Sequence, residues 1–224
     1  MRVLFIGNSH TFVNDMPHIF AVQCRELTGE EPYVEMIASP GKSLDWHLEH
    51  SIFSIRFALR YGKFDYCVCQ QSAHAFPPED ATRAAAGKLY DVIRHYGVTP
   101  VCYMTWAKKD EPQMAPVITG FYRELAKEQN VPVTPVGEIF DRINREHPEI
   151  DLYAADGGHA SVAGDYLIAA AFARLLTGVR DLSALSDRTF DHHDHTAPYD
   201  ADGLNTVLPP ETAKAIRTAV EEAE

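Results

Sequence analysis

The sequence has no excess of basic residues and no concentrated patch of positive charge. Its 224 residues include 20 lysines and arginines against 32 aspartates and glutamates, which gives a formal net charge of −12. Proteins that bind nucleic acid through phosphate contacts concentrate positive charge, and no such basic stripe is present here. The same acidity disfavours attachment to an anionic membrane surface. We therefore expect neither a nucleic-acid partner nor a membrane partner.

Metal-binding cysteine pairs and long apolar runs are also missing. The four cysteines are Cys24, Cys67, Cys69 and Cys102, and no two of them have Cys-x-x-Cys spacing. We expect buried, reduced thiols, which are typical of a reducing compartment. No apolar run approaches the roughly 20 residues of a membrane-spanning helix. The first predicted strand begins too early to leave room for a cleavable leader, so the expected location is cytoplasmic.

Short apolar runs alternate with amphipathic helical patterns along the whole chain. The predicted strands cover residues 2–6, 33–37, 66–69, 100–104 and 131–135. The predicted helices cover residues 15–27, 43–60, 79–96, 111–129, 136–146, 161–177 and 210–223. This alternation predicts an α/β protein, a three-layer α/β/α sandwich with helices on both faces of a five-stranded parallel sheet.

We expect a single domain over residues 1–224, with a polar, irregular segment at about 181–208 that forms a surface excursion. In a flavodoxin-like strand order of 2-1-3-4-5, the first strand lies between the second and the third. The loops after these three strands begin at Gly7, Ala38 and Gln70. They converge at the carboxyl edge of the sheet, where folds of this kind bind ligands.

Ser9 lies just beyond the first strand, in the sequence Gly7-Asn8-Ser9. A hydroxyl at this place faces the predicted crevice, and the following helix favours negative charge there. The motif is not the Gly-x-Ser-x-Gly elbow of α/β-hydrolases, because Thr11 occupies the position of the second glycine. On position alone, Ser9 is equally an ordinary turn or cap serine.

A second motif supplies chemical partners for Ser9. Asp156 and His159 are three residues apart, with two glycines between them. A serine hydroxyl needs a base to remove its proton, and the base needs a carboxylate to orient its ring. An Asp/His pair on a tight turn before a helix provides both. Ser9, His159 and Asp156 together predict a catalytic triad.

Acyl transfer also requires hydrogen-bond donors for a developing oxyanion. The backbone N–H of Ser9 is one candidate, and that of Gly41, in the loop after the second strand, is another. A third donor is expected from a side-chain amide after the third strand, either Gln70 or Gln71, since an amide donates without titrating.

Four blocks resemble those of the SGNH/GDSL hydrolase superfamily, in this order: Gly7-Asn8-Ser9, Gly41, the Gln70-Gln71-Ser72 strand end and Asp156-x-x-His159. The resemblance spans nearly the whole chain. It implies a flavodoxin-like sandwich and a Ser-His-Asp mechanism on esters, often acetyl groups on carbohydrates. It also implies that the amides of Ser9 and Gly41 are oxyanion donors.

Two blocks depart from the family pattern. Gly-Asn-Ser stands in place of Gly-Asp-Ser, and the Gly-x-Asn-Asp block is absent. Gln70 is then the expected substitute for the family's asparagine donor, with Gln71 as the second choice. The predicted function is a serine esterase for a small carboxylic ester, such as an O-acetylated carbohydrate, with no cofactor. The oligomeric state stays open between a monomer and a homo-oligomer.

Two alternatives accompany this prediction: a non-catalytic ligand-binding module on the same fold, and a metal-dependent hydrolase. The second would use the cluster from His192 to His195, although consecutive residues cannot all face one ion. Trp106, His74 and Phe76 follow predicted strands and are candidates for either the pocket or the core. His10 adjoins Ser9 too closely in sequence to act as its base.

Overall fold

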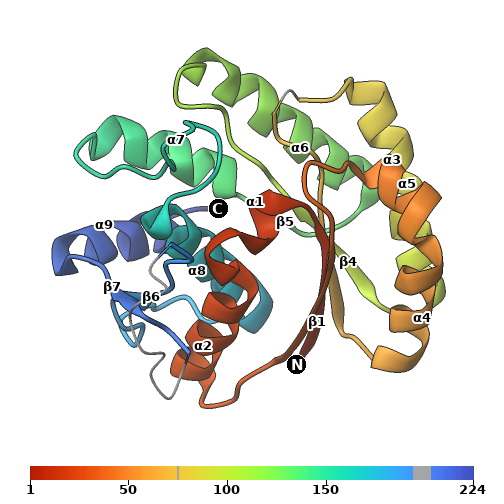
Figure 1. The fold of residues 1–224 in the computed structure, drawn as a ribbon, viewed down its shortest axis with the longest axis horizontal. Coiled ribbons are helices and arrows are strands. Elements are labelled where there is room, and N and C mark those ends of the chain that lie inside the picture. The colour runs from red at the N-terminus through yellow and green to blue at the C-terminus, as the bar shows by residue number, and fades with distance from the viewer. Residues whose placement is uncertain (75, 194–202) are drawn as a thin grey trace.

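A five-stranded parallel sheet runs through the middle of the molecule (Figure 1). The computed structural model describes residues 1–74, 76–193 and 203–224. The strands are β1 (Arg2–Gly7), β2 (Tyr33–Ala38), β3 (Tyr66–Gln70), β4 (Thr99–Tyr103) and β5 (Val133–Thr134). They lie in the order 2-1-3-4-5, and every neighbouring pair is parallel. The predicted fold class and strand order are confirmed.

Helices cover both faces of the sheet (Figure 1). One face is covered by α2 (Met16–Thr28), α7 (Val136–Glu146), α8 (Val162–Thr177) and α9 (Pro210–Glu221). The other face is covered by α3 (Leu44–Trp46), α4 (Ile52–Gly62), α5 (Glu79–His95) and α6 (Ala115–Gln129). A short helix, α1 (Ser9–Phe12), links β1 to the helices of the first face.

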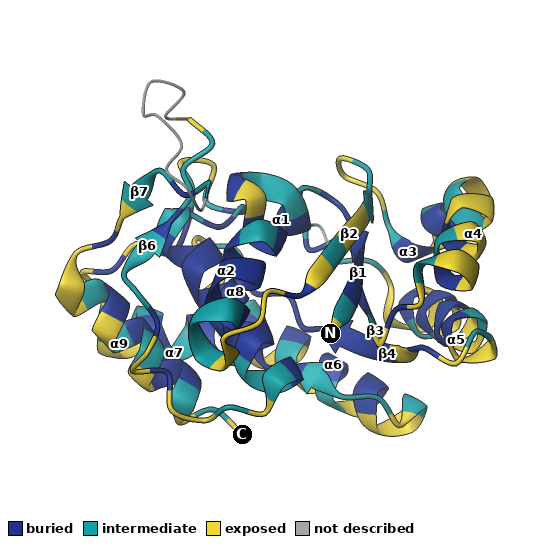
Figure 2. Ribbon diagram, turned by 90° about the horizontal axis from the view of Figure 1, so that it is seen from below, coloured by how far each residue is buried: buried dark blue, intermediate teal, exposed yellow. Residues whose placement is uncertain are grey.

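Strand β1 shows how the sequence divides the core in two. Val3 and Phe5 point to the α2–α8 face, while Leu4 and Ile6 point to the α4–α5 face, and all four side chains are fully buried. This burial on both sides explains why the strand is continuously apolar rather than alternating. Figure 2 shows β1 and β4 as largely dark, buried strands between helices whose outer surfaces are exposed, whereas the edge strand β2 is partly exposed.

Three segments differ from the sequence-based expectations. Helix α1 was not expected, and the helix predicted over residues 43–60 contains a π-helical turn at His47–Ser51 between α3 and α4. In segment 181–208, β6 (Arg188–Thr189) and β7 (Thr206–Val207) form an antiparallel pair. Four leucines of that segment are buried in the core: Leu182, Leu185, Leu204 and Leu208. They hold it against the α8–α9 layer, so it is more than a surface excursion.

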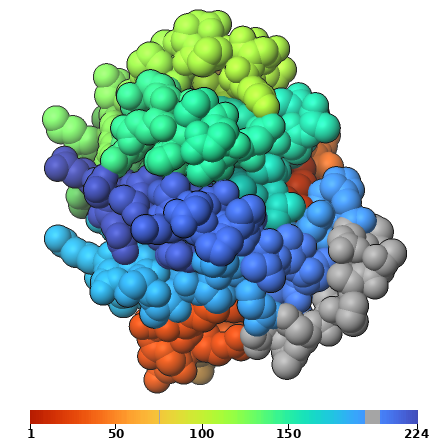
Figure 3. Space-filling model, turned by 90° about the vertical axis from the view of Figure 1, so that its left-hand side faces the viewer, coloured from red at the N-terminus to blue at the C-terminus, as the bar shows by residue number. Residues whose placement is uncertain are grey.

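The C-terminal helix closes this side of the molecule. Figure 3 shows α9 in dark blue, lying between α7 and the chain that follows α8. The four cysteines are buried and free of disulfides, as expected. Within the described part of the chain, no helix combines the length and the apolarity that crossing a bilayer requires.

Asp165 places a carboxyl group inside helix layer α2–α8. Its side chain is 1% exposed, and its Oδ2 accepts a hydrogen bond of 2.8 Å from Asn14 Nδ2. Burial raises the pKa of Asp165 well above its ordinary value, because a charged carboxylate is poorly solvated there. At a pH between the unfolded and the folded pKa, the folded protein therefore retains a proton on Asp165 that the unfolded chain releases.

We expect Asp165→Asn to stabilise the protein at neutral pH but not in acid. Between the unfolded pKa near 4 and the raised folded pKa, the free energy of unfolding of the wild type falls by up to about 1.4 kcal/mol per pH unit. Asparagine resembles the protonated acid and does not titrate, so the free energy of unfolding of the variant does not fall with pH through this group. Urea unfolding of both proteins at about pH 5 and about pH 7 measures the difference. The exposed Asp110→Asn variant is the control and should keep the pH dependence of the wild type. If the free energy of unfolding of Asp165→Asn fell with pH as steeply as that of the wild type, the expectation would be contradicted.

Candidate active site

Ser9 is the first residue of α1, immediately beyond the carboxyl end of β1. The Asn8 side chain caps this short helix, since its Oδ1 accepts the His10 N–H at 3.0 Å. Asn8 Nδ2 donates to Lys42 O at 2.9 Å, and the Asn8 backbone N–H donates to Gln70 Oε1 at 2.8 Å. The backbone just before Ser9 is thus fixed by the segments that follow β2 and β3.

Asp156 and His159 lie on a tight turn between α7 and α8. Asp156 Oδ1 accepts the backbone N–H groups of Gly158 at 2.9 Å and of His159 at 3.0 Å. Gly157 has φ +69°, a backbone conformation that favours glycine. The turn closes with an Ala154 N–H to His159 O hydrogen bond of 2.8 Å. The backbone therefore holds the carboxylate beside the ring it contacts.

The His159 ring connects this turn to Ser9. Its Nδ1 lies 2.5 Å from Asp156 Oδ2, and its Nε2 lies 2.8 Å from Ser9 Oγ. An ionised carboxylate only accepts hydrogen bonds, so Nδ1 carries the proton and Nε2 is free to accept from the hydroxyl. The structure thus brings together the three side chains that the sequence predicted, with the imidazole between the acid and the alcohol.

The charge of Asp156 is well supported although the side chain is largely exposed. Its hydrogen bond with His159, followed by the backbone N–H groups of Gly158 and His159, holds the pKa of Asp156 well below its usual range. The carboxylate therefore remains ionised, and able to orient His159, throughout the pH range in which a histidine base can operate.

Two further histidines flank His159. The His10 ring stacks on it with centroids 4.4 Å apart and planes at 11°. Burial, then the positive charge that His159 can carry, lowers the pKa of His10 to about 3. Burial also lowers the pKa of His74, whose Nε2 lies 3.2 Å from Gly158 O. Both rings are therefore neutral: His10 stacks on His159, and His74 contacts His10 with ring centroids 4.9 Å apart.

A cavity of about 330 Å³ opens beside Ser9 and His159. Its lining residues are Asn8, Ser9, His10, Gly41, Ser72, Ala73, His74, Lys108, Asp156 and His159. The two backbone donors expected from the sequence, those of Ser9 and Gly41, border the same space. Gly41 has φ +67°, and neither N–H makes a protein hydrogen bond within the described residues. Both are available to a ligand.

The structure gives no support to Gln70 or Gln71 as the third oxyanion donor, because their amides are used inside the protein. Gln70 is fully buried: its Oε1 accepts from Asn8 N and from Thr11 Oγ1 at 3.0 Å, and its Nε2 donates to Gln71 O. Gln71 Nε2 donates to Thr82 Oγ1 at 3.2 Å, and its Oε1 accepts two backbone N–H groups. Neither side chain lines the cavity, so both support the loops rather than an oxyanion.

Other candidates divide between the pocket and the core. Trp106 is 1% exposed and stacks on Phe140. Its Nε1 donates to Gly158 O at 3.0 Å, so this buried ring supports the Asp/His turn. Phe76 packs against Phe121 in the core, with ring centroids 5.3 Å apart. The sequence analysis gave Ser72 no role of its own and missed the pocket residue Lys108, although the place of Lys108 after β4 was a usable signal.

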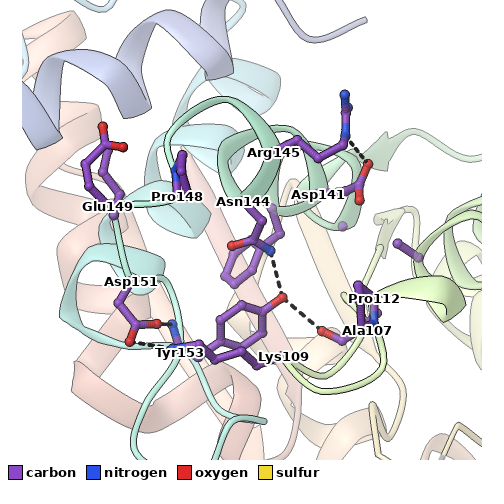
Figure 4. Close-up of a pocket in the computed structure, with 14 residues that line it drawn as sticks. Ala107, Lys109, Pro112, Asp141, Asn144, Arg145, Pro148, Glu149, Asp151 and Tyr153 are labelled. Atoms are coloured by element: carbon purple, nitrogen blue, oxygen red, sulfur yellow. Dashed lines mark hydrogen bonds and ion pairs between the residues drawn. The ribbon is translucent and has the colours of Figure 1, made fainter.

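A larger cavity of about 500 Å³ lies behind the loop that follows β4, and Figure 4 shows its lining. Its polar groups are largely paired with one another. Asn144 Nδ2 donates to the Tyr153 hydroxyl oxygen, Oη, at 2.9 Å, and that hydroxyl donates to Ala107 O at 3.2 Å. No residue of the triad borders this space, so its size does not make it the reactive site.

The metal hypothesis concerns residues only partly described. Asp194 and His195 lie outside the described residues, and within the rest no group of three potential ligands gathers around one point. His192 Nδ1 lies 2.6 Å from Asn14 Oδ1, and Asn14 also donates to the buried Asp165. Neither His192 nor Asn14 lines the cavity beside Ser9.

Comparison with known proteins adds independent information. No family model and no curated protein matches the chain. A protein of Slackia heliotrinireducens assigned to the SGNH hydrolases is similar in structure, with a TM-score of 0.65 and 26% identity over 79% of this chain and 98% of that one. A DUF4886 family protein from Bacteroides uniformis has a TM-score of 0.68 and 18% identity, over 99% of this chain and 93% of that one.

An acetylxylan esterase from Geobacillus stearothermophilus has a TM-score of 0.61 and 15% identity, over 77% of this chain and 92% of that one. At this identity the likeness concerns the fold alone. The match to the Slackia protein is more specific, and it agrees with the motif order along the chain. The strand order and the similarity to the Slackia protein support a fold of the SGNH/GDSL hydrolase type for this chain.

Proposed function

We propose that this protein is a serine esterase that hydrolyses small carboxylic esters through a covalent acyl-enzyme. The observation that carries the proposal is the 2.8 Å contact between His159 Nε2 and Ser9 Oγ, with the other ring nitrogen held by Asp156. A hydroxyl in this arrangement can lose its proton as it attacks a carbonyl carbon.

In the first half of the reaction, Ser9 Oγ forms a bond to the acyl carbon and its proton moves to His159 Nε2. The carbonyl oxygen becomes negatively charged and accepts hydrogen bonds from the N–H groups of Ser9 and Gly41. The bond to the leaving alcohol then breaks, and the alcohol oxygen takes the proton from Nε2. Asp156 stabilises the imidazolium while it exists.

In the second half, water attacks the acyl carbon and gives its proton to the same nitrogen of His159. The second tetrahedral intermediate uses the same two N–H groups. Its collapse returns the proton to Ser9 Oγ and releases the carboxylic acid. The neutral, packed rings of His10 and His74 limit rotation of His159, so one ring position serves both halves.

A small acyl group, such as acetyl on a carbohydrate, is the proposed acyl part. The reactive cavity of about 330 Å³ suits a compact ester. The similar fold of an acetylxylan esterase is consistent with this choice but does not carry it.

The test is covalent labelling of Ser9 by a fluorophosphonate probe, which reacts with activated serines. We expect one labelled peptide, containing Ser9, and stoichiometric loss of hydrolysis of a chromogenic acetyl ester. Ser9→Ala should remain unlabelled and inactive while its circular dichroism is unchanged. Ser72→Ala is the matched control, because Ser72 borders the same cavity without touching His159.

Two results would contradict the proposal. If Ser9→Ala still hydrolyses the ester, the nucleophile lies elsewhere. If a folded wild type takes no label at Ser9, the chain is better described as a ligand-binding module with the same fold.

A further inference from the structure

Lys108 lies beside the Asp/His turn, in a segment that is anchored on both sides of it by Trp106 and Lys109. The Trp106 Nε1–H donates to Gly158 O at 3.0 Å, and the Lys109 N–H donates to Gly157 O at 2.9 Å. Both acceptors belong to the turn that carries Asp156 and His159. The residue between these anchors is therefore held at a constant place relative to the reactive groups, unlike a lysine on a free loop.

The side chain of Lys108 borders the reactive cavity. It is half-buried, and it lies close enough to His74 for its positive charge to help lower the pKa of that ring. Its neighbour Lys109 points elsewhere and pairs with Asp151 at 2.7 Å. Within the described residues, no carboxylate lies within salt-bridge distance of the Lys108 ammonium.

The surroundings of this ammonium offer it little compensation. The protein has a net charge of −12, yet the Lys108 ammonium at this cavity has no acidic partner within the described residues. Among the described residues that border the cavity, Asp156 is the one carboxylate, and it is engaged by His159 and two backbone N–H groups. A half-buried cation in this position gains most from a ligand that brings a negative charge.

We propose that Lys108 makes the esterase selective for esters that carry a carboxylate near the scissile bond. The inference rests on the proposed function and specifies its substrate class. A single ammonium matches a single negative charge, which favours a carboxylate over a phosphate dianion. Lys108 binds this group and takes no part in bond breaking, so it determines specificity and is not a catalytic residue.

Two pairs of esters of similar size separate charge from shape. Meta-acetoxybenzoate and its methyl ester differ by one charge on the alcohol part. Ethyl hydrogen succinate and ethyl butyrate differ by one charge on the acyl part. In at least one of the two pairs, we expect the wild type to hydrolyse the anionic ester with a kcat/KM about tenfold higher than that of its uncharged partner at low salt. This ratio should shrink as salt is added.

Lys108→Met should reduce this preference to about one, whereas Lys109→Met, the matched control on the same loop, should retain it. The ratio within a pair cancels a general loss of active enzyme, so a partly folded variant still gives an answer. A wild type that hydrolyses both esters of each pair equally would overturn the inference and leave the esterase proposal intact. A preference that survives in Lys108→Met would also overturn it. Failure of Ser9 labelling would instead remove the proposed function itself.

Discussion

Asp156→Asn is expected to lower kcat for ester hydrolysis by about 10⁴-fold with little change in melting temperature. The asparagine oxygen can replace Oδ1 and keep the N–H groups of Gly158 and His159. Its NH₂ group then faces His159 Nδ1, which must become an acceptor. The ring proton moves to Nε2, where it faces Ser9 Oγ in place of a lone pair. The base is present but has the wrong tautomer.

The measurement is kcat on a chromogenic acetyl ester, together with a thermal melt of each protein. Asp110→Asn, an exposed acid on the loop after β4, is the control and should keep wild-type turnover. A loss of less than about tenfold for Asp156→Asn would mean that the carboxylate does not set the ring tautomer.

Gln70→Leu is expected to destabilise the fold by about 2–5 kcal/mol, because two buried donors lose their acceptor. These donors are the Asn8 N–H and the Thr11 hydroxyl, both of which reach Gln70 Oε1. Leucine fills a similar volume, so the loss reports the hydrogen bonds rather than a cavity. Because Asn8 directly precedes Ser9, turnover by the remaining folded protein should fall as well.

Urea unfolding measures this loss, with exposed Gln113→Leu as the control that should unfold like the wild type. The result also distinguishes the two roles considered for Gln70. A supporting residue lowers stability when replaced. If Gln70→Leu instead kept full stability and lost only kcat, the oxyanion role would be restored.

The contacts of His159 with Ser9 and Asp156 could be predicted from the sequence because they depend on local and topological rules. Ser9 follows the first strand of a parallel sheet, and strand ends of that kind meet at one edge. The Asp156–His159 spacing on a glycine-rich turn brings the two side chains together whatever surrounds them. The contact between the two motifs, 150 residues apart in the chain, follows from the strand order.

The roles of the glutamines could not be predicted in this way. Gln70 ends β3, and its place was right, but the direction of its amide depends on how closely Gly7 approaches it. A Cβ added at Gly7 would lie 2.6 Å from Gln70 Oε1, so the glutamine fills the space beneath the β1–α1 turn. Such packing between neighbouring strands leaves no pattern in a single sequence.

Lys108 illustrates a second limit. Lysines are common on surface loops, and nothing in Trp106-Ala107-Lys108-Lys109 tells which of the two points to the cavity. The distinction arises from Asp151, which captures Lys109, and from the carbonyls of Gly157 and Gly158, which hold the loop on either side of Lys108.

The tie between this loop and the Asp/His turn has a consequence for how relatives of the protein can diverge. Ser9 follows β1, and the turn that carries His159 is hydrogen-bonded to the segment leaving β4, so the sheet between them sets their separation. The loops leaving β2 and β3 carry no member of the triad. Apart from Gly41 and the contacts that Lys42 and Gln70 make with Asn8, mutation can therefore remodel those two loops, and with them the choice of substrate, without altering the distance between Ser9 and His159.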